Sequence, residues 1–173
     1  MRNTSVLLRL AAAVGGILLC VTAAVAADAT AMLKNAKGED VGQVQLTQTP
    51  NGVLIHAEVH GLPAGTHAFH IHETGVCTAP AFTSAGGHFN PTHKHHGFKD
   101  PNGPHLGDLP NLFIGSNGSG QVDVFGYGVH LTGENAVLDA NGAAFVIHAG
   151  ADDYASDPSG DAGARLACGV IQR

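Results

Sequence analysis

The strongest constraint on the fold is the spacing of apolar residues after residue 28. Eight short segments alternate apolar and polar side chains, and clusters of Gly, Asn, Asp and Pro separate them. Period-two alternation is the pattern of half-buried β-strands, whereas an amphipathic helix repeats every 3.6 residues. The expected strands cover residues 29–34, 41–48, 52–61, 66–73, 111–116, 120–127, 142–149 and 165–172.

This number of strands in one domain indicates an all-β fold, either a β-sandwich or a flattened barrel. Two segments, 74–110 and 149–164, contain no expected strand. Loops of such length in a compact domain are usually functional. We therefore expect two long functional loops to carry the site.

Residues 1–26 have the pattern of a cleaved signal peptide: two arginines, an apolar run and a final Ala-Val-Ala. A retained membrane anchor fits less well, because the apolar run is short for a bilayer span. A lipoprotein signal at Cys20 is the third choice, since Leu19 stands where a small residue is usual. The expected mature domain is 27–173.

Charge and cysteine content limit the partners and the compartment. Loss of both leader arginines changes the net charge from −6 to −8, with six Lys and Arg against fourteen Asp and Glu. So acidic a chain is a poor nucleic-acid binder, and no membrane partner is expected after cleavage. Export, to the periplasm or alternatively the extracellular space, favours a disulfide between the two remaining cysteines, Cys77 and Cys168.

Strand parity places three histidines on one side of the sheet. In the segment FHIH, His70 and His72 share one face while Phe and Ile share the other. The same alternation in FVIH puts His148 opposite its Phe and Ile. Since large apolar side chains point to the core, the three histidines should converge on the outside of the sheet, beneath the long loops.

The stretch from His88 to Asp108 holds five histidines and ends in a carboxylate. Alone it is equally typical of a solvated loop or of a metal-scavenging tract. Together with three convergent strand histidines it predicts a metal site, because imidazole and carboxylate are common ligands of zinc and copper.

Five segments, in order, resemble the signature segments of the copper–zinc superoxide dismutase family: HAFHIHETGVC, SAGGHFNP, HHGFKDPNGPHLGDLPN, VIHAGADDY and GDAGARLACGV. The resemblance extends from about residue 30 to the C-terminus. It implies an eight-stranded Greek-key β-barrel, one copper and one zinc per chain, and the dismutation of superoxide to oxygen and hydrogen peroxide, an antioxidant activity.

The resemblance also implies a set of metal ligands, in which His88 bridges both ions and Asp152 links a copper histidine to a zinc histidine. His95 is the alternative to His96 for zinc; we prefer His96 because Gly97 follows it and its distance to His105 fits the family. The implied copper ligands are His70, His72, His88 and His148, and the implied zinc ligands are His88, His96, His105 and Asp108.

The same resemblance pairs Cys77 with Cys168 and makes His88 and Arg165 the catalytic residues, with Arg165 a fixed cation beside copper. One departure concerns the segment 149–164, which has four Asp and no Lys where many family members carry lysine. Attraction of superoxide must then depend on Arg165 and the metals, with Lys94 or Lys99 as further candidates.

The alternative function is that of an exported, non-enzymatic copper and zinc store or carrier. Storage needs neither an open copper position nor a neighbouring arginine, and this sequence keeps the residues for both. A β-sandwich adhesion module would leave the ordered histidines unexplained. Between a monomer and a homodimer the sequence does not decide.

Overall fold

The computed structural model describes Met1 and residues 27–173, so the predicted signal peptide lies outside the described residues apart from Met1. The described chain is almost entirely strand and loop, with one short 3-10 helix at Thr83–Ala85. The strands are β1 (Ala29–Asn35), β2 (Asp40–Thr49), β3 (Gly52–Val59), β4 (Gly65–His67), β5 (Phe69–His72), β6 (Leu112–Ile114), β7 (Gly120–Tyr127), β8 (Ala144–His148) and β9 (Arg165–Val170).

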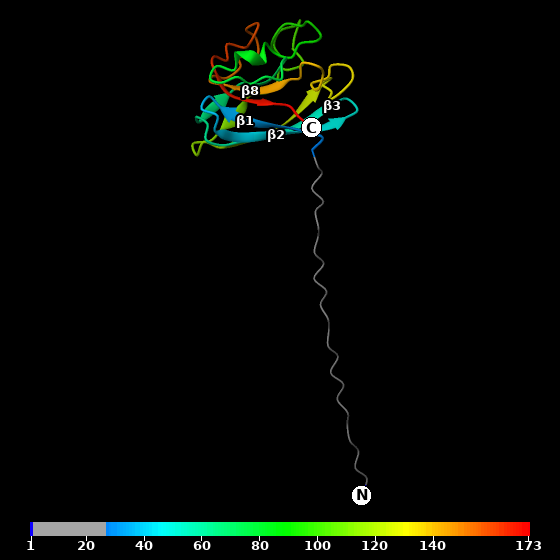
Figure 1. Cartoon of the computed structure of the whole chain (residues 1–173), viewed down its shortest axis with the longest axis vertical. Helices are drawn as coiled ribbons and strands as arrows, with labels where there is room; N and C mark the ends of the chain where they lie inside the picture. The colour runs from blue at the N-terminus through cyan, green and yellow to red at the C-terminus, as the bar shows by residue number, and fades with distance from the viewer. Residues whose placement is uncertain (2–26) are drawn as a thin grey trace.

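Seven strands form one antiparallel sheet in the order β5-β8-β9-β1-β2-β3-β7, and β4 pairs with β6. Strands distant in sequence are neighbours, as β9 is of β1, which is the Greek-key arrangement. The sheet curls so that β8 lies over β1 and β2, and the long loops gather on the far side of β8 (Figure 1). The all-β prediction is confirmed.

The predicted strand at 66–73 is divided in two at Ala68. The Ala68 N–H donates to the carbonyl of Gly150 (2.8 Å), and its carbonyl accepts from the N–H of His148 (2.9 Å). These bonds separate β4, which pairs with β6, from β5, which pairs with β8. Each half therefore belongs to a different sheet, which accounts for the ninth strand.

The core confirms the predicted parity. Phe69, Ile71, Phe145 and Ile147 are fully buried on the inner side, and the two phenylalanine rings stack at 5.2 Å. Complete burial of one such side chain stabilises the fold by about 1.5–3 kcal/mol. The opposite side of β5 and β8 is buried as well, because the long loops cover it.

The disulfide between Cys77 and Cys168 is present, as predicted, and closes a loop with a sequence separation of 91. Its Cα atoms are 5.7 Å apart, within the usual range. Beneath it, Phe82 and Val146 belong to a small second apolar cluster. The bond thus fastens the first long loop to β9 at the side of the sheet where the histidines lie.

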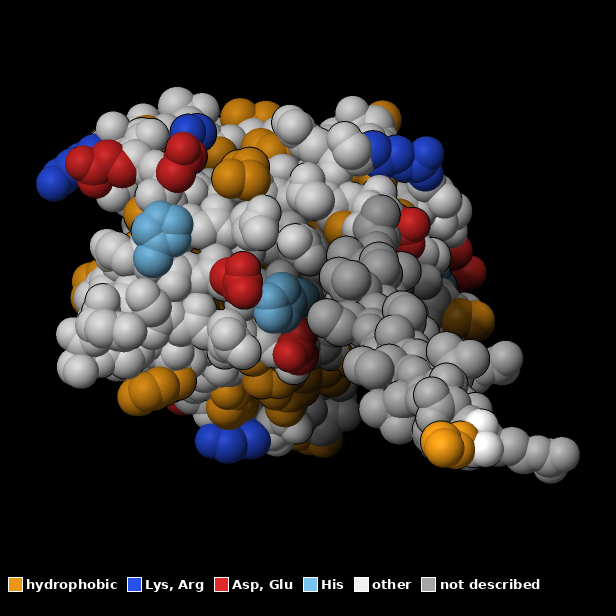
Figure 2. Space-filling view, turned by 90° about the horizontal axis from the view of Figure 1, so that it is seen from below, with side chains coloured by type: hydrophobic (Ala, Val, Ile, Leu, Met, Phe, Trp, Pro, Cys, Tyr) orange, Lys and Arg blue, Asp and Glu red, His pale blue; other side chains and the backbone are white. Residues whose placement is uncertain are grey.

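The outer face of β2, β3 and β7 presents both polar side chains, such as Gln45 and His56, and apolar ones, such as Leu54 and Phe125. His56 pairs there with Asp123 across the two strands, and in Figure 2, which views the molecule from below, histidine side chains lie beside acidic ones. Among the described residues, no helix is long and apolar enough to cross a membrane.

Candidate metal centre

Four buried histidines meet at the outer side of β5 and β8. The ring nitrogens of His72 and His148 are 3.4 Å apart, and the rings of His70 and His88 are 4.0 Å apart between centroids. One ligand atom from each of the four lies within 4.8 Å of the others. Strand β5 pairs with β8, and the backbone of His88 forms an isolated β-bridge with His72, so three separate segments build this cluster.

A second cluster shares His88 and surrounds the carboxylate of Asp108. Oδ1 of Asp108 lies 2.9 Å from Nδ1 of His88, 3.0 Å from Nδ1 of His96 and 3.4 Å from Nδ1 of His105. Zinc–nitrogen bonds of about 2.0–2.1 Å place the ligand atoms of a tetrahedral site about 3.3 Å apart. The four donor atoms therefore already have nearly the spacing of a closed zinc site.

The carboxylate of Asp108 is oriented by backbone bonds. Its Oδ2 accepts the N–H of Gly97 (2.9 Å) and the N–H of His105 (3.0 Å), which leaves Oδ1 directed at the three imidazoles. Gly97 has φ +102°, and a Cβ there would meet the backbone of Tyr154. A glycine at 97 therefore lets this loop approach both the carboxylate and the second long loop.

Outward hydrogen bonds fix which nitrogen of each imidazole faces the centre. His72 donates through Nδ1 to the carbonyl of Gly86 (3.0 Å) and His148 through Nδ1 to that of Gly163 (3.3 Å), so both present Nε2 inward. His70 donates through Nε2 to Asp152 (2.9 Å) and presents Nδ1. Such outward bonds set the tautomer and the ring orientation of metal-ligating histidines.

Two buried nitrogens test whether the first cluster suits a metal. Nδ1 of His70 and Nε2 of His88 are inaccessible and have no hydrogen-bond partner among the described residues. An unsatisfied buried polar atom costs roughly 1–3 kcal/mol. Both atoms point into the four-histidine cluster, so an ion bound there would satisfy both, and an all-imidazole set suits copper.

The electrostatics keep the imidazoles of the first cluster in the neutral form that can bind a metal ion. Burial, aided by the neighbouring His88, lowers the pKa of His72 to about 2, and burial with the nearby His70 lowers that of His148 to about 3. Burial also outweighs the Asp108 bond and lowers the pKa of His88 to about 4. All three imidazoles are therefore neutral at pH 7, as a metal ligand must be.

The second cluster is charged. Burial opposes ionisation of Asp108, but hydrogen bonds from its histidine neighbours outweigh it and bring its pKa far below the ordinary value. Burial also opposes the charged form of His96 and by itself would lower its pKa. The hydrogen bonds to Asp108 and Asp152 outweigh burial and raise the pKa of His96 to about 9. A proton on His96 thus supplies positive charge beside Asp108, as a bound zinc ion would.

Asp152 joins the two clusters from behind. One carboxylate oxygen accepts from His70 (2.9 Å) and the other from His96 (3.0 Å). Gly160, with φ +67°, packs against this link: a Cβ there would lie 2.7 Å from Nε2 of His96 and collide with the carboxylate of Asp152. Glycine at 160 is therefore required for the link to form.

The remaining loop histidines lie outside both clusters. His96 is fully buried among the second group, whereas the side chain of His95 is 56% exposed and pairs with Asp100 at 3.2 Å. His93 is exposed as well. Of the two neighbours that the sequence left as alternatives, the structure places His96, and not His95, next to Asp108.

Arg165 lies at the mouth of the first cluster. Its guanidinium donates to the carbonyl of Phe82 (2.6 Å) and to that of Gly86 (2.7 Å), the second of which also accepts from His72. Burial lowers the pKa of Arg165, yet arginine stays charged at neutral pH. The result is a fixed cation beside the four-histidine cluster.

Two residues that position the site were not predicted from the sequence. The Asn111 side chain donates to the carbonyl of Asp152 (2.9 Å) and accepts its N–H (2.8 Å), while the Tyr154 hydroxyl accepts the N–H of Asn111 (2.8 Å). They clamp the second long loop to the sheet at Asp152. Each is a single polar residue in or beside a loop, which carries no periodic pattern in the sequence. The one available indication was that Tyr154 directly follows the pair Asp152-Asp153.

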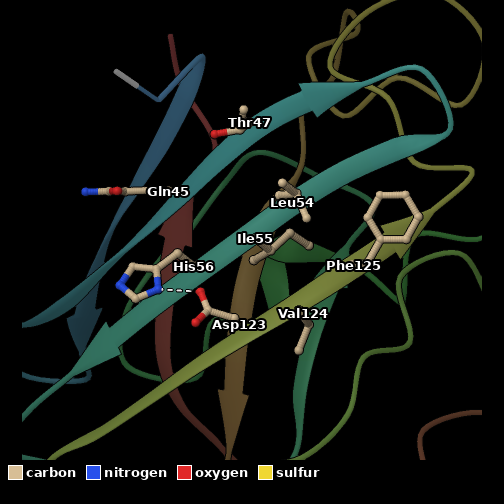
Figure 3. Close-up of a pocket in the computed structure, with 8 residues that line it drawn as sticks. All are labelled: Gln45, Thr47, Leu54, Ile55, His56, Asp123, Val124 and Phe125. Atoms are coloured by element: carbon tan, nitrogen blue, oxygen red, sulfur yellow. Dashed lines mark hydrogen bonds and ion pairs between the residues drawn. The ribbon is translucent and has the colours of Figure 1, made fainter. Parts of the chain in front are cut away.

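A different hollow, on the outer face of β2, β3 and β7, does not resemble these clusters. It is lined by Leu54 and Phe125 beside the pair of His56 and Asp123, whose atoms are 2.6 Å apart (Figure 3). A single imidazole beside one carboxylate lacks the number of ligands that either ion takes. The chemistry of the chain therefore concentrates under the long loops.

Comparisons with known proteins agree with this geometry. Residues 41–171 match the family model described as copper/zinc superoxide dismutase. The chain is 47% identical over 169 residues to a superoxide dismutase [Cu-Zn] of Aquifex aeolicus, which covers 95% of this chain and 99% of the relative. It is 43% identical over 148 residues to that of Caulobacter vibrioides, covering 83% and 85%.

Solved structures give the same fold. A superoxide dismutase-like protein of Bacillus subtilis, in a variant with a tyrosine and a proline replaced by histidine, aligns with a TM-score of 0.79 and 43% identity over 82% of this chain and 95% of that one. With the family model, the relatives and the fold in agreement, the chain belongs to the copper/zinc superoxide dismutase family.

Proposed function

We propose that this chain dismutates superoxide, 2 O₂•⁻ + 2 H⁺ → O₂ + H₂O₂, at a copper and zinc centre built around His88. The observation that carries the proposal is the shared ring of His88, whose Nε2 points into the all-histidine cluster while Nδ1 lies 2.9 Å from Asp108. One imidazole thus faces both a copper-type and a zinc-type donor set.

The residue assignment within this proposal follows the two donor sets. His88 and Arg165 are the catalytic residues, and Asp152 orients one ligand on each side. Copper would be held by His70, His72, His88 and His148, and zinc by His88, His96, His105 and Asp108.

Copper bound there would supply the one-electron exchange with superoxide, and zinc would fix the loop and the ring of His88. The chain's own residues do the rest. Arg165 attracts the anion and orients it at the cluster mouth, held in place by the carbonyls of Phe82 and Gly86. His88 can carry a proton at Nε2 and donate it to the departing peroxide.

Arg165 also separates this proposal from a storage or carrier role. A store has no use for a guanidinium fixed at the cluster mouth, whereas an enzyme for a small anion does. The test is to load the metal-free protein, residues 27–173, with copper and zinc and to measure dismutation. The proposal expects activity far above that of an equal concentration of a copper–histidine complex; metal uptake with activity no higher than that complex would support storage.

The zinc ligands are tested by a pair of neighbouring variants. His96→Ala removes a buried partner of Asp108, and His95→Ala removes an exposed side chain of the same type one position away. We expect His96→Ala to lose most zinc in a titration against a competing chelator and His95→Ala to keep it. The reverse result would move the ligand by one place.

The protein is further proposed to be exported, with residues 1–26 removed and the periplasm as its destination. The disulfide supports this proposal, because such bonds persist in oxidising compartments. Sequencing the N-terminus of the protein recovered from a periplasmic fraction tests it: Ala27 is the expected first residue, and an intact Met1 would contradict cleavage. Sedimentation of the same sample distinguishes a monomer from a homodimer.

A further inference from the structure

A cleft opens from the surface onto the four-histidine cluster. It has a volume of about 620 Å³, and three members of the cluster, His72, His88 and His148, lie in its wall. All three are buried, with at most 6% of each residue exposed. The cleft is therefore a route by which a metal ion can reach these buried ligands.

The fixed charges of this cleft give a metal cation no net attraction. Two acidic and two basic side chains lie in its lining: Glu73, Asp157, Lys94 and Arg165. Because their formal charges cancel, Coulomb attraction gives a divalent cation little preference for the cleft over the solvent. Capture of a metal ion at the mouth of the cleft must then come from a ligand atom.

His93 is the side chain in the cleft wall that can supply such a ligand atom. It lines the cleft together with the cluster histidines, and it is exposed. Its ring forms no hydrogen bond or ion pair within residues 27–173, unlike the ring of His95, which pairs with Asp100 at 3.2 Å. A neutral imidazole keeps one nitrogen lone pair free, and imidazole nitrogen is a good ligand for copper.

The backbone of His93 indicates that the imidazole has a role. Its φ is +52°, in the left-handed region where a residue with a Cβ is less stable than glycine. The turn around it is fixed: the His93 N–H donates to the carbonyl of Asn90 (3.2 Å), and the Asn90 side chain bonds the N–H and the carbonyl of Lys94, both at 2.9 Å. A strained residue in the wall of a functional cleft points to a use for its side chain.

We propose that His93 is the entry ligand for copper, which binds Cu(II) at the mouth of the cleft and passes it to the four-histidine cluster. The inference rests on the proposed function, because it takes that cluster as the copper site. The transfer is an exchange of ligands: one imidazole replaces another, or a water molecule, on the same Cu(II) ion. No electron is transferred, so no oxidant or reductant is needed.

The number of ligands sets the direction of this transfer. Among the described residues, His93 belongs to none of the groups whose ligand atoms lie close enough to hold an ion together, whereas the cluster offers four imidazoles. An ion at His93 is therefore bound weakly, and it moves on to the site that binds it tightly.

The experiment compares His93→Asn with His95→Asn in the zinc-loaded, copper-free protein, residues 27–173. Asparagine tolerates the left-handed backbone better than most residues, so His93→Asn removes the imidazole and keeps the turn. His95 is the matched control, since it is an exposed histidine of the same loop that does not line the cleft. Stopped-flow absorbance measures Cu(II) uptake, an excess of chelator measures its release, and a chelator titration measures its dissociation constant.

We expect His93→Asn to take up Cu(II) several-fold more slowly than wild type and to release it more slowly by the same factor. The dissociation constant should not change, because a group that binds the ion only in transit alters both rates and leaves their ratio. His95→Asn should match wild type in all three quantities.

Uptake by His93→Asn as fast as by wild type, or an equal loss of rate in His95→Asn, would overturn the proposal. A higher dissociation constant in His93→Asn would also overturn it, because His93 would then support the cluster itself. If the loaded wild type fails to dismutate superoxide, the proposed function falls, while the uptake and release rates still decide whether His93 is the entry ligand.

Discussion

Replacing Gly160 by alanine tests the link between the two clusters through a single methyl group. Gly160 has φ +67°, and its Cβ would lie 2.7 Å from Nε2 of His96 and 2.6 Å from Cγ of Asp152. Neither side chain is free to retreat, because His96 also contacts Asp108 at 3.0 Å and Asp152 also accepts the N–H of Tyr154 at 2.6 Å. The bond between Asp152 and His96 must therefore break.

Two costs follow, and they appear in different measurements. A left-handed backbone with a Cβ destabilises the fold by about 1 kcal/mol. Loss of an outward bond to a metal-ligating histidine typically lowers metal affinity about 10- to 100-fold, equivalent to about 1.4–2.8 kcal/mol. The first cost affects the metal-free protein, which also loses the buried hydrogen bond between Asp152 and His96, and the second affects zinc binding alone.

Gly163→Ala provides the control, since Gly163 is in the same loop with φ +74° and has no atom within 4 Å of the position its Cβ would take. Urea denaturation of the metal-free proteins measures the first cost, and zinc titration against a competing chelator measures the second. We expect the backbone conformation to cost both variants about 1 kcal/mol in stability, and Gly160→Ala to lose more because it also breaks the buried bond between Asp152 and His96. Only Gly160→Ala should lose zinc affinity; equal affinity in the two variants would show that the bond between Asp152 and His96 does not support zinc binding.

Three further predictions concern the disulfide, the arginine and the outer face. Reducing the bond between Cys77 and Cys168 should cost the metal-free protein roughly 4–5 kcal/mol in urea denaturation, as chain entropy predicts for so long a loop; an unchanged midpoint would contradict this. Arg165→Ala should retain both metals by elemental analysis yet lose at least severalfold in kcat/KM, and Arg165→Glu should lose more; a charge-reversed variant as fast as wild type would exclude the role. The bond to Asp123 raises the pKa of His56, so the ion pair stabilises the fold fully below about pH 6.5, and this stabilisation disappears as pH rises through the raised pKa. In His56→Gln the free energy of unfolding should therefore fall at about pH 5.5 and be unchanged at about pH 9. The loss at the lower pH should be only a few tenths of a kcal/mol, because solvent screens the pair.

Parity along the strands was the part of the site that the sequence could predict. A strand alternates its faces with period two, so the apolar partners of His70 and His148 were enough to place both histidines outside the core. The division of the strand at Ala68 was not predictable in this way, because it depends on carbonyl and amide groups contributed by Gly150 and His148. Backbone bonds between distant loops leave no mark in the local pattern.

Loop residues were harder to interpret for the same reason. Gly160 is one of 24 glycines, and its role depends on the approach of His96 and Asp152 from another loop. Lys94 and Lys99 look equivalent in the sequence, and only the bond from Lys99 to Asp153 separates them. The absence of lysine from residues 149–164 made both lysines candidates for attracting superoxide. Tertiary contacts decide that Lys94, and not Lys99, lines the cleft over His72 and His148.

Anomalous X-ray diffraction from crystals of the loaded protein, recorded at the copper and zinc absorption edges, tests whether His88 lies between the two ions. We expect two separate peaks with one imidazole between them: copper on the Nε2 side of His88 and zinc on the Nδ1 side, beside Asp108. A single peak, or a zinc signal at both positions after copper loading, would contradict the claim that His88 joins a redox site to a structural one.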